Sequence, residues 1–142
     1  MTAIPSQEII ARFNEGFECW NRGDLDEMMD DYHPDAEFDW SAATVDEAPR
    51  RGWKQIRDYY DHLFEFWAGV RLDPVEVIQA GEDRFVVVVR LWGESKPSGI
   101  QVEQRFAMLY TFRDEKVFLL TVYPDREAAL EAASAGASER VQ

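Results

Sequence analysis

The sequence predicts a single α+β domain in which a curved antiparallel sheet wraps over helices. In the first half of the chain, apolar residues recur at helical spacing, whereas the second half alternates like β-strands joined by short polar turns. Helices gathered early and strands later are typical of α+β folds. At 142 residues the chain is most simply one domain. We expect that domain to span residues 1–135 and the small, polar residues 136–142 to form a flexible tail.

The first helix is predicted to begin at Ser6, whose side chain can accept a hydrogen bond from a free amide at a helix start. Its apolar stripe consists of Ile9, Ile10, Phe13, Phe17 and Trp20. Gly23 marks its end, because glycine adopts the backbone conformation at which helices stop. Asp24, with Glu27 three residues later, resembles a capping box and predicts a second helix.

The stretch "YHPDAEFDWS" is divided between two predicted elements. Pro34 cannot continue a helix, so residues 32–36 are predicted to form a helix end and a turn. The following residues alternate like a short strand, with Phe38 and Trp40 on one face and Asp39 on the other.

One long helix, four strands and one short helix are predicted for the rest of the chain. After a loop, the long helix covers residues 53–67 and ends at Gly69. The strands form a meander over residues 70–80, 84–93, 101–113 and 116–123. Asp125 is expected to cap the last helix, residues 126–133.

The composition excludes several classes of partner. The 28 acids and 15 bases give a net charge of −13, which repels nucleic acids and anionic membrane surfaces. No stretch is apolar enough to span a bilayer, and the first residues lack a signal-peptide pattern. Cys19 is the only cysteine, so no intrachain disulfide can form, and we expect a cytoplasmic protein.

The sequence predicts no metal site and no cofactor. His33 and His62 are the only histidines, and they do not have metal-ligand spacing. No phosphate-binding loop, dinucleotide fingerprint or nucleophile motif is present. The nine Phe, five Tyr and five Trp residues instead suit a chain that lines a cavity with rings.

Five segments carry a family resemblance: "WNRGDLDEMM", "YHPDAEFDWS", "RRGWKQIRDYY", "VEQRFAMLYTFRDEKV" and "YPDREAALEAA". They resemble the SnoaL-like branch of the nuclear-transport-factor-two-like superfamily, which includes ketosteroid isomerase. The resemblance implies a cone-shaped sheet packed on three N-terminal helices, with a largely apolar pocket on its concave face. It also implies a homodimer formed through the outer face of the sheet.

The resemblance does not extend to the catalytic residues of ketosteroid isomerase. Those enzymes use a tyrosine, an aspartate base and a protonated aspartate, and Gly16, Trp40 and Met108 stand at these three positions. Asp39 is one residue away from the position of the base. It should therefore face away from the pocket, and it is a catalytic candidate only if a bulge turns it inward.

Tyr32, Tyr60 and Arg90 are the other catalytic candidates. By the resemblance, the two tyrosines lie at pocket positions, where they either donate to a ligand carbonyl or bond to each other. Arg90 is the only charged residue in the apolar run "FVVVVRLW". In the pocket it would hold an anion; otherwise it reaches solvent or pairs across a dimer.

By the same resemblance, the even-numbered residues of the predicted strands 84–93 and 101–113 face the pocket. The candidate ligand-binding residues are Phe17, Trp20, Phe38, Trp40, Phe64, Trp92, Gln104, Phe106, Met108 and Tyr110. Glu103 and Arg105 are expected to form a pair on the outer face. Epoxide hydrolases of this superfamily activate water with an arginine flanked by aspartates, and this pair matches only part of that set.

These residues favour a domain that binds a small apolar or aromatic molecule. If the protein is an enzyme, we expect an acid–base rearrangement such as isomerisation, cyclisation or dehydration, although no general base is assigned. A non-catalytic binding module and an interaction scaffold whose own rings fill the cone are the alternatives. A binder should have a cavity of roughly 300 Å³ or more, whereas a scaffold should leave space for only a few waters.

Overall fold

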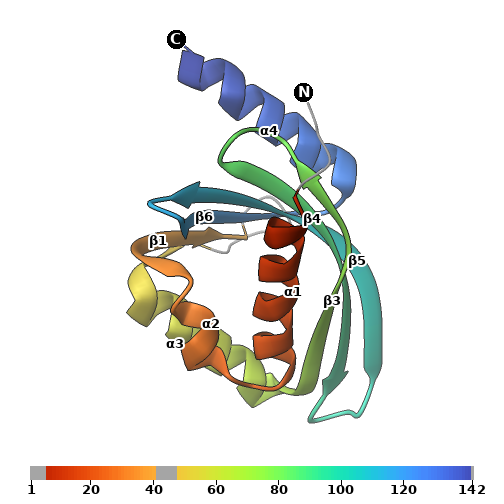
Figure 1. Ribbon diagram of the computed structural model, residues 1–142. Helices are drawn as coiled ribbons and strands as arrows, with labels where there is room; N and C mark the ends of the chain where they lie inside the picture. Colours follow the sequence, from red (N-terminus) through yellow and green to blue (C-terminus); the bar gives the residue numbers. More distant parts are fainter. Residues whose placement is uncertain (1–5, 41–47, 142) are drawn as a thin grey trace.

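The computed structural model describes residues 6–40 and 48–141, and it confirms the predicted α+β class with a curved sheet over three N-terminal helices. The predicted loop after Trp40 falls mostly on residues outside this range. The helices are α1 (Gln7–Asn21), α2 (Leu25–Met29), α3 (Gly52–Phe66) and α4 (Arg126–Val141). In Figure 1, α1, α2 and α3 lie inside the curve of the sheet and α4 lies outside it. The strands are β1 (Tyr32–Asp39), β2 (Arg50–Arg51), β3 (Trp67–Gln79), β4 (Arg84–Ser95), β5 (Gln101–Arg113) and β6 (Lys116–Tyr123).

The six strands form one sheet in the order β2-β1-β6-β5-β4-β3. The predicted meander from β3 to β6 is antiparallel throughout. The pairing of β1 with β6 is parallel, so the sheet is not antiparallel everywhere as expected. Short turns force antiparallel neighbours, whereas β1 and β6 are distant in the chain and no turn constrains their relative direction.

Three helices begin at the predicted caps. Ser6 Oγ accepts a hydrogen bond from the Ile9 amide at 3.3 Å. Asp24 Oδ1 accepts one from the Glu27 amide at 3.3 Å, and Asp125 caps α4 in the same way. Capping depends on residues three apart in the chain, which is why sequence patterns predict it well.

The segment 32–36 is a strand and not the predicted helix end. β1 begins at Tyr32, which pairs with Val117 of β6. Pro34 is tolerated here because the register shifts between Tyr32 and Glu37, and β2 pairs with β1 only from Glu37 onward. Proline stops a helix, but at such an irregular position it does not stop a strand.

Two other predicted helix boundaries differ from the structure. α3 ends at Phe66 and β3 follows at once from Trp67, so Gly69 lies within a strand. α4 extends to Val141, past the predicted end at residue 133. In the described parts of the chain, no helix has the length and apolar character needed to cross a membrane.

The register between β4 and β5 decides which side chains face inward. Leu91 lies directly opposite Gln104. Directly opposed residues share a face of a sheet, so odd-numbered residues of β4 and even-numbered residues of β5 lie together on the concave face. The predicted orientation is therefore right for β5 and wrong for β4. Arg90 and Trp92 lie on the convex face.

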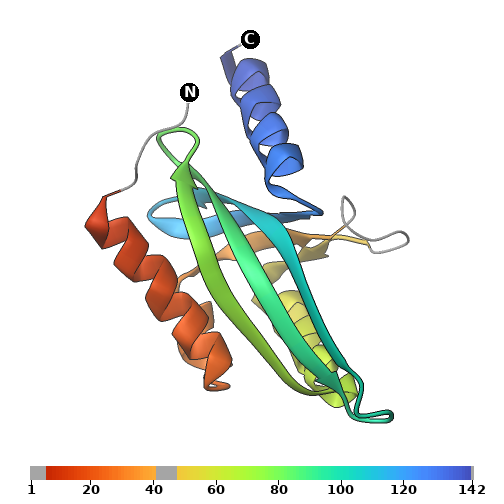
Figure 2. The same ribbon diagram turned by 90° about the vertical axis from the view of Figure 1, so that its right-hand side faces the viewer.

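One end of the convex face is covered by α4 (Figure 2), which packs against β4, β5 and β6. The contact forms a second core made of Ile78, Val86, Ala107, Leu109, Ala129 and Ala133. Arg84 Nη1 donates to the Ala133 carbonyl at 2.8 Å, and Arg126 forms an ion pair with Glu76 at 2.9 Å. The rest of β3, β4 and β5 has no described helix over its convex side in this view.

On the concave side, α1 is fastened to the edge strand β3. The Asn21 side-chain amide donates to the Leu72 carbonyl at 2.9 Å, and its oxygen accepts from the Leu72 amide at 2.8 Å. Trp20 Nε1 donates to the Val70 carbonyl at 3.0 Å. These bonds satisfy backbone groups of an edge strand and hold α1 across the hollow of the sheet.

Candidate functional site

A cavity of about 240 Å³ lies between the concave face of the sheet and the helices. Most of its surface is apolar, and side chains of α1 and β5 supply much of it. The predicted residues that line it are Phe17, Trp20, Tyr32, Phe38, Trp40, Tyr60, Gln104, Phe106, Met108 and Tyr110. The volume exceeds the few waters that a filled scaffold would leave, and it lies slightly below the usual small-molecule range.

Aromatic contacts join the side chains of the cavity wall to one another. Trp20 meets Tyr60 edge to face, with ring centroids 5.0 Å apart, and Phe38 meets Tyr60 in the same way at 5.6 Å. Phe13 contacts Tyr110 at 4.8 Å. Edge-to-face pairs contribute beyond the area that they bury, so these rings hold each other in place and leave the space beside them open.

Gly16 widens the cavity on the side of α1. It lines the cavity, and apart from its chain neighbours and the nearby backbone of α1, no atom lies within 4 Å of the position that its Cβ would occupy. Glycine within a helix costs roughly 0.5–1 kcal/mol relative to alanine. Space beside α1 is therefore retained at a position where a side chain would both fit and favour the helix.

Tyr32 and Tyr60 bond to each other, which is one of the two arrangements that the sequence left open. Their hydroxyl oxygens are 3.2 Å apart, and both residues are buried. Burial raises the pKa of Tyr32 to about 12 and the pKa of Tyr60 well above its ordinary value. Both phenols therefore keep their protons at neutral pH. One hydroxyl hydrogen lies between the two oxygens, and the other remains available to an acceptor in the cavity.

The hydroxyl of Tyr110 is a further donor at the same wall. Its one hydrogen bond in the described structure is to Met108 Sδ at 3.8 Å, and a thioether is a weak acceptor. Burial raises the pKa of Tyr110 well above its ordinary value, with smaller contributions from Tyr32 and Asp31. This phenol is thus a neutral donor without a strong acceptor.

An ion pair that the sequence reasoning missed lines the cavity near these tyrosines. Arg12 Nε donates to Asp31 Oδ2 at 3.0 Å, and Arg12 Nη2 donates to Asp31 Oδ1 at 2.9 Å. Nη2 also donates to the Glu115 carbonyl, and the guanidinium lies 4.7 Å from the centre of the Phe112 ring. Arg12 borders the apolar stripe of α1, immediately before Phe13, and that position was the available signal. No spacing pattern pointed to Asp31.

Two residues predicted for the pocket lie on the opposite face of the sheet. The side chain of Arg90 is 50% exposed, and its Nη1 lies 3.6 Å from a Glu103 carboxylate oxygen. Trp92 is 37% exposed. The predicted pocket roles of Arg90 and Trp92 are therefore wrong, because β4 has the opposite phase.

Asp39 and Phe64 also lie outside the cavity lining among the described residues. Burial raises the pKa of Tyr123, and the charge of Asp39 adds to this increase. Tyr123 packs against the second core, which lies on the convex face. Asp39 therefore faces away from the cavity, as expected without a bulge, and it is no longer a candidate catalytic residue. Phe64 packs on Trp20, with ring centroids 5.2 Å apart, and supports the wall from behind.

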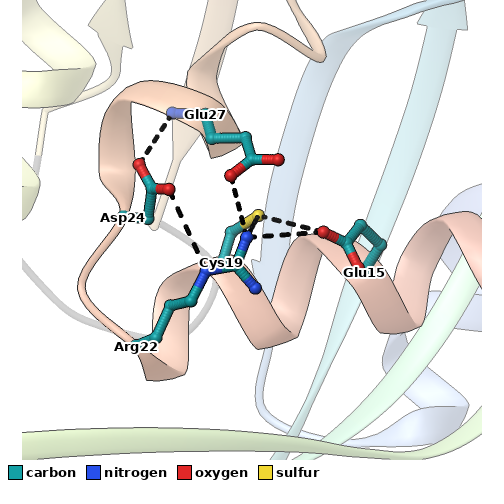
Figure 3. A network of polar contacts seen from close by, with 5 residues as sticks. All are labelled: Glu15, Cys19, Arg22, Asp24 and Glu27. Carbon is teal, nitrogen blue, oxygen red and sulfur yellow. Dashed lines mark hydrogen bonds and ion pairs between the residues drawn. The ribbon is translucent and has the colours of Figure 1, made fainter.

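Acidic side chains around Cys19 are close enough together to ligate a metal, but they form hydrogen bonds with an arginine (Figure 3). Glu15, Cys19 and Glu27 offer ligand atoms within 4.8 Å of one another. Arg22 Nη2 donates to Glu27 at 2.8 Å, to Cys19 Sγ at 3.3 Å and to Glu15 at 3.4 Å. Asp24 lies 3.9 Å from Arg22 Nε. The guanidinium thus supplies the positive charge in this group, and it ties the end of α1 to α2.

Comparisons with known proteins agree with this architecture. The family model of the SnoaL-like domain matches residues 13–119. None of the curated proteins matches the chain. Among solved structures, TerC co-crystallised with polyporic acid is 22% identical, with a TM-score of 0.71, and the match covers 88% of this chain and 97% of TerC.

Two further solved structures show the same fold. A protein from Catenulispora acidiphila with a ketosteroid-isomerase-like fold, in complex with trimethylamine, is 15% identical with a TM-score of 0.70, covering 92% of this chain and 95% of the other. SalBIII is an epoxide hydrolase/cyclase-like enzyme with a role in pyran ring formation in the polyether salinomycin. It is 21% identical with a TM-score of 0.67, covering 82% of this chain and 88% of SalBIII.

Proposed function

Since the chain belongs to the SnoaL-like domain family, we propose that it binds a small, largely apolar or aromatic molecule in the cavity between α1 and the sheet. The observation that carries the proposal is the combination of an apolar, ring-lined cavity with hydroxyl donors in its wall. Small-molecule sites have this composition, with a few polar groups that orient the ligand.

The donors indicate the ligand chemistry. One hydroxyl hydrogen of the Tyr32–Tyr60 pair and the hydroxyl of Tyr110 lack a strong protein acceptor in the described structure. A buried donor without an acceptor costs roughly 1–3 kcal/mol. A ligand carbonyl or ether oxygen would remove this cost, so the preferred ligand carries such an oxygen on a flat apolar frame.

The reaction class that fits this wall is an acid–base rearrangement such as cyclisation or isomerisation. Two neutral phenols aimed at one oxygen would stabilise the negative charge that develops there when a neighbouring C–H bond ionises. The role of SalBIII, a structural neighbour, in pyran ring formation supports a cyclisation. No metal or cofactor enters this scheme.

A non-catalytic binding module is the second candidate. Trp40 and Met108, which are apolar, line the cavity, and they make it drier and less reactive. An enzyme should both bind and convert its ligand, whereas a binding module should only bind it. A turnover assay therefore distinguishes the two candidates.

A homodimer through the convex face accompanies both candidates. The region of β4 and β5 beyond α4 exposes Trp92 beside the charged Arg90, Glu103 and Arg105. An exposed aromatic residue surrounded by charges is typical of the centre of an interface and its rim.

Filling the cavity at Gly16 tests the binding function. We expect 2-naphthol, titrated by calorimetry, to bind the wild type and to bind Gly16→Leu at least tenfold more weakly, because the new side chain occupies the open space. Ala11→Leu is the matched control, since Ala11 lies on the same helix and is exposed. Equal affinity of Gly16→Leu and the wild type, or no binding to the wild type, would contradict the proposal.

A further inference from the structure

We propose that Asp31 is the general base of this cavity and that Arg12 is its positioning residue. The proposal rests on the proposed function and adds the substrate class: a compound with an acidic C–H bond next to a carbonyl group. It supplies the base that the sequence left unassigned.

Asp31 is the one carboxylate among the described residues that line the cavity. It lies in the short link between α2 and β1, directly before Tyr32. Its side chain is 45% exposed, so the group contacts solvent as well as the cavity lining. A base at such a position can take a proton from a bound molecule and later exchange it with water.

Arg12 holds the Asp31 carboxylate in a fixed orientation. Each carboxylate oxygen accepts one hydrogen bond from the guanidinium, at 3.0 and 2.9 Å. A carboxylate oxygen has two acceptor sites, so each keeps one for a proton. The guanidinium itself is fixed by the Glu115 carbonyl and by the Phe112 ring. Such a base does not need to change its rotamer before it reacts.

The base and the hydroxyl donors line the same cavity. After burial, the charge of Asp31 contributes to the raised pKa values of both Tyr32 and Tyr110. The carboxylate is therefore close enough to both hydroxyls for its charge to act on them. A base beside oxyanion donors is the arrangement that proton abstraction next to a carbonyl requires.

The reaction step balances without any other reactant. An Asp31 oxygen takes the proton from the carbon next to the carbonyl. The electron pair of the broken C–H bond forms a C=C bond, and the carbonyl π electrons move to the oxygen. The tyrosine hydroxyls hold the resulting enolate oxygen. The proton then returns to another carbon in an isomerisation, or to the new alkoxide when the enolate attacks a second carbonyl in a cyclisation.

Deuterium exchange tests the base directly. The probe is 2-tetralone, a bicyclic aromatic ketone, whose exchange at C1 in heavy water is followed by proton NMR. The wild type should accelerate exchange over buffer, and Asp31→Asn should slow the protein-dependent rate at least 100-fold, as is typical for loss of a general base. Affinity for 2-naphthol, measured in parallel, should change less than threefold. Asp35→Asn is the control, because Asp35 is an exposed acid four residues away.

Arg12 variants distinguish positioning from a purely structural role. Arg12→Met should slow exchange about tenfold or more, and Arg12→Lys should restore part of the rate. Both should leave 2-naphthol affinity within threefold. If Asp31→Asn fails to fold, Asp31→Glu takes its place, since it keeps the charge and moves the carboxylate by one methylene. A rate at least tenfold below wild type then supports the proposal, and an unchanged rate overturns it.

The outcomes separate the two proposals. Binding of 2-naphthol without wild-type exchange above buffer, or with full exchange by Asp31→Asn, overturns the role of Asp31 and leaves the binding function intact. Absence of 2-naphthol binding to the wild type overturns the binding function itself.

Discussion

Leu91 of β4 lies directly opposite Gln104 of β5, and the side chains of both line the cavity. The residues one position away, Arg90 and Arg105, are opposite each other as well, and they must face the convex side. One pairing register therefore excludes Arg90 from ligand contact and places a charged stripe on the outer wall.

Replacing Arg90 by Met should leave ligand binding unchanged. The affinity for 2-naphthol should stay within about twofold, because the guanidinium lies on the convex face beside Glu103. Stability should change by at most about 1 kcal/mol, as is usual for exposed ion pairs. Leu91→Phe, one residue away on the concave face, should weaken binding by narrowing the cavity. Calorimetric titration measures both, and a large loss of affinity in Arg90→Met would contradict the register argument.

The Tyr32–Tyr60 hydrogen bond should appear as coupling in a double-mutant cycle. Tyr32→Phe or Tyr60→Phe alone should lower the free energy of unfolding by roughly 1–3 kcal/mol, because one buried hydroxyl loses its partner. The double variant should cost less than the sum of the two. Urea unfolding of the four proteins measures this, and strict additivity would show that the hydroxyls do not interact.

Alkaline pH should destabilise the fold through the buried phenols. Burial raises the pKa of Tyr32 from 10.0 to about 12, so the folded state keeps a proton that the unfolded state releases near pH 10. This contribution to stability is complete below pH 10 and is lost as the pH rises toward 12, at about 1.4 kcal/mol per pH unit for one group. Urea unfolding between pH 8 and 11.5 should show a shallower decline for Tyr32→Phe than for the wild type. Identical slopes would mean that Tyr32 titrates normally.

Removing the Arg22 charge should destabilise the junction of α1 and α2. Arg22→Met leaves Glu15, Asp24 and Glu27 close together without a cation, so the melting temperature should fall, and 0.5 M NaCl should recover part of the loss by screening. Arg71→Met is the control, because Arg71 faces a single acid at the surface. A salt-independent melting temperature in Arg22→Met would argue against charge repulsion.

Trp92→Glu should dissociate the proposed homodimer. Light scattering should give the mass of a dimer for the wild type and of a monomer for this variant, because a charge would replace the exposed ring at the centre of the interface. Ile100→Glu is the control, since Ile100 is exposed in the β4–β5 turn, away from that centre. A wild-type monomer at micromolar concentration would refute the dimer.

Sequence reasoning succeeded where a feature depends on neighbouring residues. The caps at Ser6, Asp24 and Asp125 are set by side chains three positions from the amides that they bind. β5 and β6 have the predicted bounds because alternation and the turn between them are local signals. Tyr32 was placed in the wrong element because its strand partner, Val117, is far away in the chain.

The sequence by itself determined the α+β class, the helix starts, the antiparallel meander and the supply of rings for a cavity, since periodicity and capping act over a few residues. The tertiary structure alone decided which side chains of β4 face the cavity and that β1 pairs in parallel with β6. It also decided that Arg12 pairs with Asp31. These depend on strand register and on contacts between distant segments. A shift of one residue in register reverses every side chain of a strand, and no local pattern in an apolar run such as "VVVV" distinguishes the two faces.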